Sequence, residues 1–163
     1  MHFELTQRFT SSPAEVGDAY ADAALYPTLV GLPKLGGIEV LDLATADGHV
    51  RSRIRYRFQD HLPAAVTAVV DPHKLTWVQV TDHDLAAGTA TFRLDPDHYP
   101  DRLKASGSFR ITAAADGGAV RVVTGDLKVK VLLVAGQVEH AIVDGLGEYL
   151  QAEAPAVDAY VAG

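Results

Sequence analysis

The chain has 163 residues, with 14 Lys and Arg against 21 Asp and Glu, and a formal net charge of −7 at pH 7. This acidic balance argues against a general nucleic-acid binder, because contacts with phosphates need an excess of basic side chains. The absence of cysteine excludes disulfides, thiolate nucleophiles and cysteine-based metal sites.

The length fits one domain over residues 1–163 and is enough to bury a substantial core. The first residues lack the basic and apolar regions of a signal peptide. No apolar run approaches the roughly 20 residues that a membrane span needs, and the longest, Val129–Ala135, is broken by Lys130. We therefore expect a cytoplasmic protein without stable membrane insertion.

The first elements are predicted to be a strand and short helices. Hydrophobic and polar residues alternate over His2–Thr10, which is typical of a half-buried strand. Ser12 is a good N-cap, and Glu15 follows it at the spacing of a capping box. The helix that starts there is predicted to reach about Ala24, and a further helical turn is predicted at Thr28–Leu32.

The middle of the chain is predicted to be mostly strands. Ile38–Ala44 and Val50–Phe58 form a predicted hairpin, because Asp47-Gly48 between them is a strong turn signal. Further expected elements are a short helix at Pro63–Val70, a strand pair at Lys74–Thr81 and Thr89–Leu94, and a polar loop at Asp95–Asp101.

The last third predicts a long hairpin followed by a long helix. The strands are Leu103–Ala115 and Ala119–Val131, and Gly107 and Gly125 could mark bulges that bend them. The helix is predicted over Gly136–Tyr160. Its apolar face has helical spacing and consists of Val138, Ala141, Ile142, Gly145, Leu146, Tyr149 and Ala152, and Pro155 is expected to kink it.

Strands flanked by helices predict an α+β domain. We expect a curved antiparallel sheet of about six to seven strands, wrapped around the long C-terminal helix, with short helices after the first strand. A cavity is expected between the sheet and this helix. The alternative is a core that side chains fill completely.

The chain resembles the START-like superfamily, also called SRPBCC or helix-grip proteins, and within it a bacterial domain-of-unknown-function family. The resemblance rests on the segments Ser11–Val16 and Val129–Ile142 and on Trp77, and it extends over nearly the whole chain. Leu132 departs from the pattern, because a proline is expected before the long helix. The resemblance implies binding of lipids, sterols, polyketides or hormones, or catalysis of cyclisation, dehydration or ring hydroxylation. Fold alone does not choose among these functions.

The predicted strand registers and helix face point a set of mostly apolar side chains into the expected cavity. Such a lining is typical of small-molecule sites. The candidate ligand-binding residues are Ile54, Tyr56, Phe58, Trp77, Phe92, Phe109, Val138, Ile142, Leu146 and Tyr149. The polar groups that could orient a ligand are those of Ser52, Tyr56, Gln79 and Tyr149, although the favoured interpretation of any one of them is a hydrogen-bonded core residue.

Four arginines, Arg51, Arg53, Arg55 and Arg57, occupy alternate positions of one predicted strand and therefore share a face. They could bind an anionic partner. The favoured interpretation is a solvated outer face that is paired across strands with Glu39 or Asp42.

Two patterns could suggest a metal site: Asp82-His83-Asp84, and His140 with Asp144. The first is expected in a loop, where neighbouring side chains diverge, and the second on the polar face of the helix, so we expect no metal and no cofactor. His61, His73 and His98 are expected in exposed loops.

No catalytic motif is apparent, and few ionisable side chains are predicted to face inward. Asp126 and Lys128 are the exceptions to watch, because a bulge at Gly125 could turn either one inward.

The preferred hypothesis is binding of a small hydrophobic ligand such as a fatty acyl chain, isoprenoid or polyketide. Access would be gated by Tyr26–Pro33 and by the loops near Asp60–Pro63 and Asp95–Asp101. The alternatives are an enzyme of the cyclase or dehydratase type in the same cavity, and an interaction module that uses the Arg51–Arg57 face. The sequence does not identify a protein partner.

Overall fold

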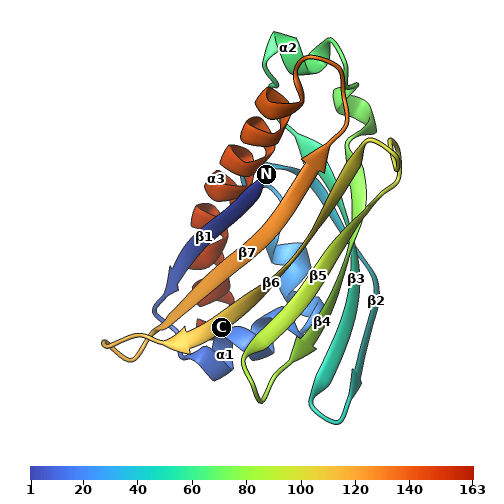
Figure 1. Ribbon diagram of the computed structural model, residues 1–163. Helices are drawn as coiled ribbons and strands as arrows, with labels where there is room; N and C mark the ends of the chain where they lie inside the picture. The colour runs from blue at the N-terminus through green and yellow to red at the C-terminus, as the bar shows by residue number, and fades with distance from the viewer.

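A computed structural model describes residues 1–163 as a seven-stranded antiparallel sheet that curves around one long helix (Figure 1). The spatial order of the strands is β1-β7-β6-β5-β4-β3-β2, so β1 and β2 form the edges. The strands are β1 (His2–Phe9), β2 (Lys34–Ala46), β3 (His49–Gln59), β4 (Thr76–Asp84), β5 (Thr89–Pro96), β6 (Leu103–Ala113) and β7 (Ala119–Val129). The predicted α+β architecture is confirmed.

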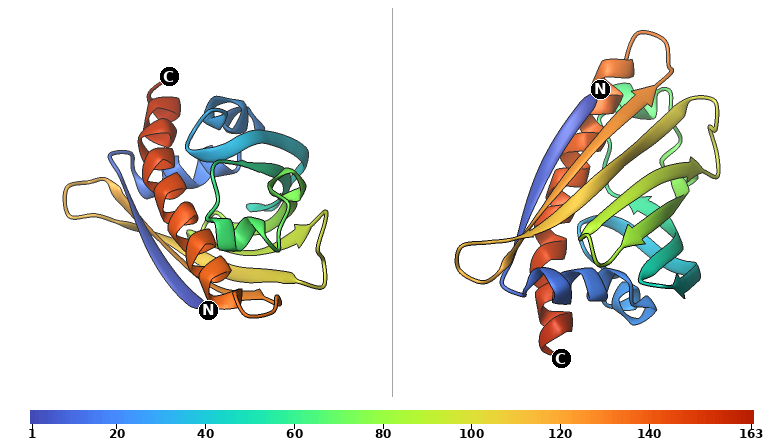
Figure 2. Two further views of the ribbon diagram at one scale, coloured as in Figure 1. Left: turned by 90° about the horizontal axis from the view of Figure 1, so that it is seen from above. Right: turned by 60° about the horizontal axis from the view of Figure 1, so that its bottom comes forward.

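The long helix α3 (Ala135–Ala162) lies across the concave side of the sheet, as both views of Figure 2 show. The short helices α1 (Pro13–Tyr20) and η1 (Ala23–Leu29) lie at one end of the molecule. At the other end are α2 (Ala64–Thr67), the turn η2 (Pro72–Lys74) and the β7–α3 loop. None of the helices is long and apolar enough to cross a membrane.

The predicted capping box at α1 is confirmed. The backbone N–H of Glu15 donates to Ser12 Oγ over 3.3 Å, and the backbone N–H of Ser12 donates to the Glu15 carboxylate over 2.8 Å. The predicted end of the helix at Ala24 is wrong. Asp22 accepts from the N–H of Ala24 and thereby starts a separate 3₁₀ helix, which replaces the turn predicted at Thr28–Leu32.

The Asp47-Gly48 turn is confirmed, and both of its residues have the positive φ that a tight hairpin needs. The strands that it joins are longer than predicted. Two register shifts in β2, at Leu35/Gly37 and Val40/Asp42, interrupt the pairing with β3. Apart from the paired glycines Gly36-Gly37, no residue pattern signals a bulge at these positions.

The predicted bulges at Gly107 and Gly125 are wrong. The two glycines face each other in an unbroken β6–β7 register. A Cβ on Gly107 would lie 2.8 Å from Phe92 Cζ, and one on Gly125 would lie 2.9 Å from Phe3 Cε1. These glycines therefore leave room for aromatic rings on the concave side and do not bend the strands.

Two further boundaries differ from the prediction in ways that affect the site. Strand β4 starts at Thr76 and continues through Asp84, so Asp82-His83-Asp84 lies in a strand and not in a loop. Its partner β5 extends to Pro96, into the predicted polar loop. The short helix predicted over Pro63–Val70 is confined to Ala64–Thr67.

Helix α3 continues as one helix past Pro155.

Candidate ligand cavity

A cavity of about 250 Å³ lies between α3 and the concave side of the sheet. Of the 41 residues that line it, 29 are hydrophobic. The volume exceeds the engineered cavity of about 150 Å³ that accommodates benzene, and it lies just below the range of about 300–1,000 Å³ typical of ligand pockets. The site is therefore large enough for a small apolar molecule.

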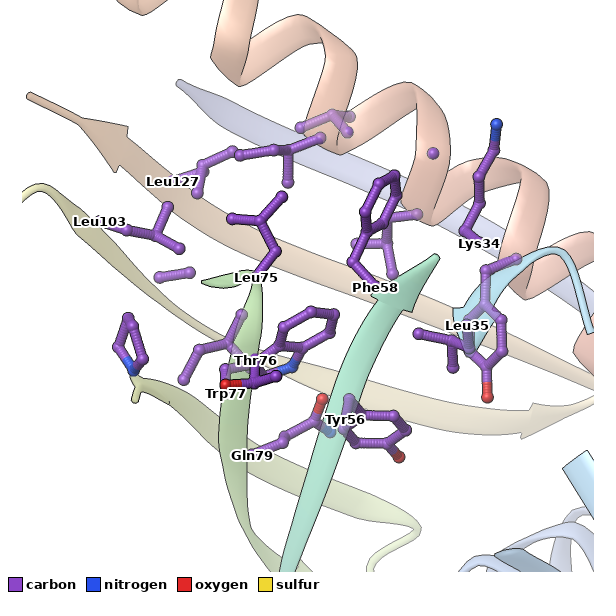
Figure 3. A pocket seen from close by; sticks show the side chains of 18 of the residues that line it. Lys34, Leu35, Tyr56, Phe58, Leu75, Thr76, Trp77, Gln79, Leu103 and Leu127 are labelled. Carbon is purple, nitrogen blue, oxygen red and sulfur yellow. The ribbon is translucent and has the colours of Figure 1, made fainter. Parts of the chain in front are cut away.

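All ten residues proposed from the sequence line this cavity. Strands β3 and β4 contribute Tyr56 and Trp77, whose rings stack at 5.8 Å between centroids, and Phe58 lies nearby (Figure 3). The two residues are directly paired across the strands, which aligns their rings on the same face. That these ten residues bind a ligand stays a prediction.

The inward face of α3 is wider than predicted. Val143, Leu150 and Glu153 also line the cavity, although only the first two are apolar. Ala152, predicted on this face, is only half-buried and does not line it. Among the expected orienting groups, Gln79 lines the cavity, whereas Ser52 is buried beside it and its hydroxyl has no partner.

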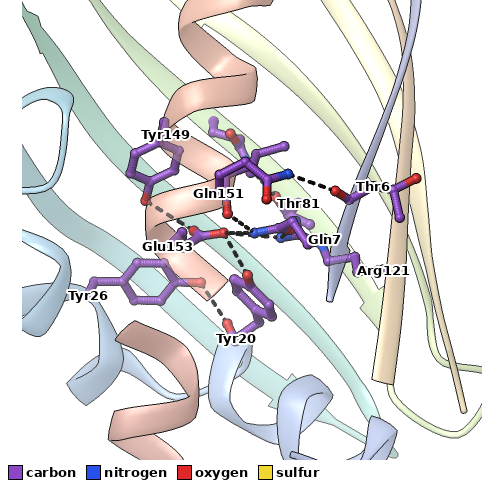
Figure 4. A network of polar contacts seen from close by, with 11 residues as sticks. Thr6, Gln7, Tyr20, Tyr26, Thr81, Arg121, Tyr149, Gln151 and Glu153 are labelled. Carbon is purple, nitrogen blue, oxygen red and sulfur yellow. Dashed lines mark hydrogen bonds and ion pairs between the residues drawn. The ribbon is translucent and has the colours of Figure 1, made fainter. Parts of the chain in front are cut away.

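A polar network occupies the part of the cavity nearest α1 and η1 (Figure 4). At its centre is the buried carboxylate of Glu153, which accepts hydrogen bonds from Tyr20 at 2.6 Å, Gln7 at 3.0 Å and Tyr149 at 3.0 Å. Arg121 Nη1 lies 3.4 Å from the same carboxylate. The network joins β1, α1, β7 and α3, and burial raises the pKa of both tyrosines.

Arg121 is buried within this network and retains unused donor capacity. Its Nη1 donates to Gln7 at 2.8 Å and to Glu153. Its guanidinium carbon lies 4.3 Å from the Tyr20 ring centroid and 4.1 Å from that of Phe109. The Nε atom is buried and has no hydrogen-bond partner. An unpaired donor at this depth is costly, because it lacks the hydrogen bond that water would supply.

His83 is a second polar group of the cavity lining that the sequence pattern did not predict. It lies on the inward side of β4 in phase with Trp77, is 6 % exposed, and packs edge-on against Phe109 at 5.6 Å. Burial and then the charge of Arg121 lower the pKa of His83 to about 4, so the ring is neutral at pH 7. Its Nε2 is buried without a partner.

The expectation that few ionisable groups face inward is therefore wrong, since His83, Arg121 and Glu153 all line the cavity. Asp126 and Lys128 are exposed, because the alternation of β7 continues through Gly125 and points them outward. Asp82 and His140 are also exposed, and the chain contains no group of three side chains positioned to hold a metal ion.

The cavity opens at the end of the sheet near α2. Lys74, His98 and Arg102 line it there and are exposed to solvent. Leu62 and Tyr99, from two of the three loops expected to gate access, also line the cavity. In the third, Tyr26–Pro33, Tyr26 lines the opposite end, where its hydroxyl donates to the Tyr20 carbonyl at 2.6 Å. Gating by these loops stays a prediction.

The Arg51–Arg57 face lies on the outside of the sheet and is mostly paired. Arg55 forms two hydrogen bonds of 3.1 Å to Asp97 and lies 3.9 Å from Glu39. Arg51 lies 3.7 Å from Asp82, and Arg57 donates to a backbone carbonyl. Pairing of an arginine with Glu39 was expected, whereas Asp42 forms no ion pair.

The sheet, the gripped helix and the cavity between them define the helix-grip architecture of START-like (SRPBCC) proteins, as the sequence predicted. The chain belongs to the family described as "Protein of unknown function (DUF2505)", whose pattern matches residues 4–161. No curated protein matches the chain.

Several solved structures share this fold at low sequence identity. The protein TTHA0849 from Thermus thermophilus is 12 % identical with a TM-score of 0.69, over 99 % of this chain and 97 % of that one. The Zhui aromatase/cyclase from Streptomyces sp. R1128 is 19 % identical with a TM-score of 0.68, over 99 % and 93 %. Norcoclaurine synthase from Thalictrum flavum is 17 % identical with a TM-score of 0.64, over 99 % and 86 %. At these identities the likeness concerns the fold alone.

Proposed function

We propose that the protein binds a small, mostly apolar molecule in the cavity, with one neutral oxygen group of the ligand facing Arg121 and His83. The observation that carries the proposal is an apolar cavity of about 250 Å³ whose inner end holds two buried nitrogens without partners. Ligand sites of this kind combine an apolar lining with a few convergent polar groups.

The apolar lining supplies affinity, and the polar end supplies orientation. A ligand that loses roughly 200 Å² of apolar surface from water gains about 5 kcal/mol. Association costs at least about 4 kcal/mol in lost freedom of motion, so apolar burial alone gives weak binding. A hydrogen bond to the otherwise unpaired Arg121 Nε adds to the affinity and fixes which end of the ligand enters first.

The charges around the polar end favour a neutral ligand group. Arg121 is already balanced by Glu153, and His83 is uncharged at neutral pH. A carboxylate entering here would leave a net buried negative charge, which is costly in a low-dielectric site. A ketone, quinone or hydroxyl oxygen accepts from Nε without that cost, so the proposed class includes polyketide-like and isoprenoid ketones and alcohols.

Titration with N-phenyl-1-naphthylamine, a neutral apolar probe, tests cavity binding. Trp77 is the only tryptophan and lines the cavity, so bound probe is expected to quench its fluorescence. Ala141→Phe places a ring in the cavity and is expected to weaken binding of the probe by at least about tenfold. The control is Ala159→Phe on the exposed side of the same helix, which is expected to change nothing.

Native mass spectrometry of freshly purified protein, followed by organic extraction, identifies the natural ligand. A stoichiometric neutral adduct supports the proposal. Probe binding that is equal in the Ala141→Phe and Ala159→Phe proteins contradicts it, because the probe would then bind elsewhere.

A second candidate function, cyclisation or dehydration of a bound ketone, is favoured by the neutral imidazole of His83 beside the Arg121 guanidinium. The fold is also shared with proteins described as an aromatase/cyclase and as norcoclaurine synthase. Against it, a base with a pKa near 4 is weak at neutral pH, since general bases work best when their pKa lies near the operating pH. We therefore place binding first.

The mass and the chromatographic retention of a supplied ketone, compared before and after incubation, separate the two functions, because a cyclisation without loss of water leaves the mass unchanged. A carrier returns the same molecule that it was given, whereas a dehydratase returns one that has lost water. His83→Asn is expected to preserve probe binding in both cases, and it would stop the mass change only in an enzyme.

A further inference from the structure

Two leucines project into solvent at the end of the molecule where the cavity opens. Leu132 is 88 % exposed and Leu133 is fully exposed at 101 %. They lie in the loop between β7 and α3, directly after Val131, which lines the cavity. Exposure of two adjacent leucine side chains to water is unfavourable unless another apolar surface covers them.

The backbone holds these side chains outward. Leu133 has a φ of +69°, a left-handed conformation that is rare for a leucine, and the N–H of Val134 donates to the Leu132 carbonyl over 2.9 Å. This tight γ-turn therefore presents Leu132 and Leu133 at its apex. We call residues 131–134 the leucine tip.

A second uncharged segment lies beside the leucine tip. Residues 62–70, which include α2, contain no charged side chain. Figure 1 shows α2 next to the start of α3 and the β7–α3 loop. Together the two segments give this end of the molecule an uncharged edge beside the cavity opening.

Basic side chains lie at the same end of the molecule as the leucine tip, although the whole chain is acidic. Four of the five lysines lie at this end: Lys74, Lys104, Lys128 and Lys130. Lys104 and Lys128 face each other across β6 and β7, and the backbone N–H of Lys130 donates to the Arg102 carbonyl over 2.7 Å. None of these basic side chains forms an ion pair within the protein.

The acidic side chains at the same end are fewer or already engaged. Glu139 lies 3.7 Å from the N-terminal ammonium group and accepts from the N–H of Val129, and Asp97 binds Arg55. Asp71 and Asp101 remain exposed without an ion pair, and Asp126, two residues from Lys128 on the same face of β7, contacts only His2. Two like-charged lysines placed opposite each other destabilise a sheet slightly, unless an external anion neutralises them.

We propose that the leucine tip and its basic surroundings dock the protein on an anionic lipid bilayer. The two leucines would insert below the headgroups, and the lysines would lie against lipid phosphates. The acidic remainder of the chain would face away from the membrane, which fixes the orientation. The cavity opening would then face the bilayer, so that an apolar ligand passes between them without crossing water.

Vesicle co-sedimentation of the full chain tests the proposal. Vesicles of phosphatidylcholine alone are compared with vesicles that also contain phosphatidylglycerol, at low and at high salt. We expect binding to the anionic vesicles that weakens with salt, because the lysine contribution is electrostatic. No preference for the anionic vesicles overturns the proposal.

Matched variants locate the contact. The change Leu132→Ser with Leu133→Ser is expected to lower partitioning on the order of tenfold for each leucine. The control Val30→Ser alters another large hydrophobic residue, 54 % exposed, and is expected to leave partitioning unchanged. All three sites are exposed, so these variants are expected to fold normally.

The charge contribution has its own pair of variants. Lys128→Gln with Lys130→Gln is expected to weaken binding about fivefold per lysine. The control, Arg8→Gln with Arg110→Gln, removes two exposed, unpaired arginines at the opposite end of the sheet and is expected to have no effect. An equal loss in both pairs overturns the proposal, because net charge alone would then explain the binding.

Two further outcomes keep the proposals separate. The leucine-tip variants are expected to bind N-phenyl-1-naphthylamine in solution as the unaltered protein does. Membrane docking can therefore fail while cavity binding is observed, and cavity binding can fail while membrane docking is observed. If the leucine changes alter the oligomeric state in gel filtration but not vesicle binding, the tip is a protein contact and the proposal is wrong.

Discussion

Replacement of Glu153 by leucine is expected to destabilise the protein strongly. The change removes the acceptor of four hydrogen bonds, one of them from Arg121, and leaves the guanidinium of Arg121 buried without a counter-charge. Hydrogen bonds to a charged group contribute about 1.5–3 kcal/mol each, and breaking a buried ion pair typically costs about 3–5 kcal/mol. We expect the free energy of unfolding to fall by about 3–5 kcal/mol, a large part of the 5–15 kcal/mol available to a typical domain.

Urea unfolding followed by circular dichroism measures this loss, and a double-mutant cycle with Arg121→Met isolates the ion pair. The double variant removes both charges and is expected to recover at least about 2 kcal/mol relative to the sum of the single changes. The control Asp144→Leu changes an exposed acid on the same helix and is expected to have little effect. A loss below about 1 kcal/mol for Glu153→Leu, or strict additivity in the cycle, would refute the reasoning.

Three further predictions concern pH, glycines and a contact between α3 and the loop that joins β1 to α1. The pKa of His83 falls from an ordinary 6.5 to about 4 in the folded protein, so below pH 6.5 the unfolded state binds a proton that the folded state does not. The free energy of unfolding is therefore expected to fall between pH 6.5 and 4, by up to about 3 kcal/mol. The urea midpoints at pH 7 and at pH 4.5 are expected to differ less in the His83→Gln variant than in the unaltered protein. Gly107→Ala is expected to destabilise the protein by several kcal/mol, because the added Cβ would meet the β7 backbone. Gly147→Ala in α3 is expected to stabilise it by about 0.5–1 kcal/mol. Thermal unfolding measures both changes. Asp158→Ala removes a carboxylate that accepts from the backbone N–H groups of Thr10 and Ser11 at 2.9 and 3.0 Å, and the variant is expected to lose about 1–2 kcal/mol in urea unfolding; an unchanged midpoint would argue against that anchoring contact.

The sequence predicted the fold and the apolar part of the site because both depend on local periodicity. Tyr56 and Trp77 were placed inward by strand alternation, and Ile142 by helical spacing. The polar end was missed, although the same periodicities point to it. Arg121 shares the inward parity of Val123, and Glu153 follows Tyr149 by one helical turn.

No local sequence pattern predicts that these polar groups contact one another. Arg121 and Glu153 lie 32 residues apart, and Gln7 is 114 residues from Arg121. In the sequence, each of these charged side chains therefore looks like an unpaired charge on an otherwise apolar face. Only the tertiary structure shows the partner that makes its burial possible. His83 was missed for a different reason, since the aspartates on either side of it signalled a loop.

The pairing of β1 with β7 has a consequence during protein synthesis. Gln7 leaves the ribosome long before Arg121, and at about 5–20 residues per second the intervening segment takes on the order of 10 s to translate. Throughout that time the first strand has no partner in the sheet, and the glutamine that ends with no exposed surface in the native state remains in water. The first strand of the sheet is therefore among the last to find its partner, and until β7 has emerged the nascent chain carries an unpaired, half-apolar strand that nascent-chain chaperones are well suited to hold.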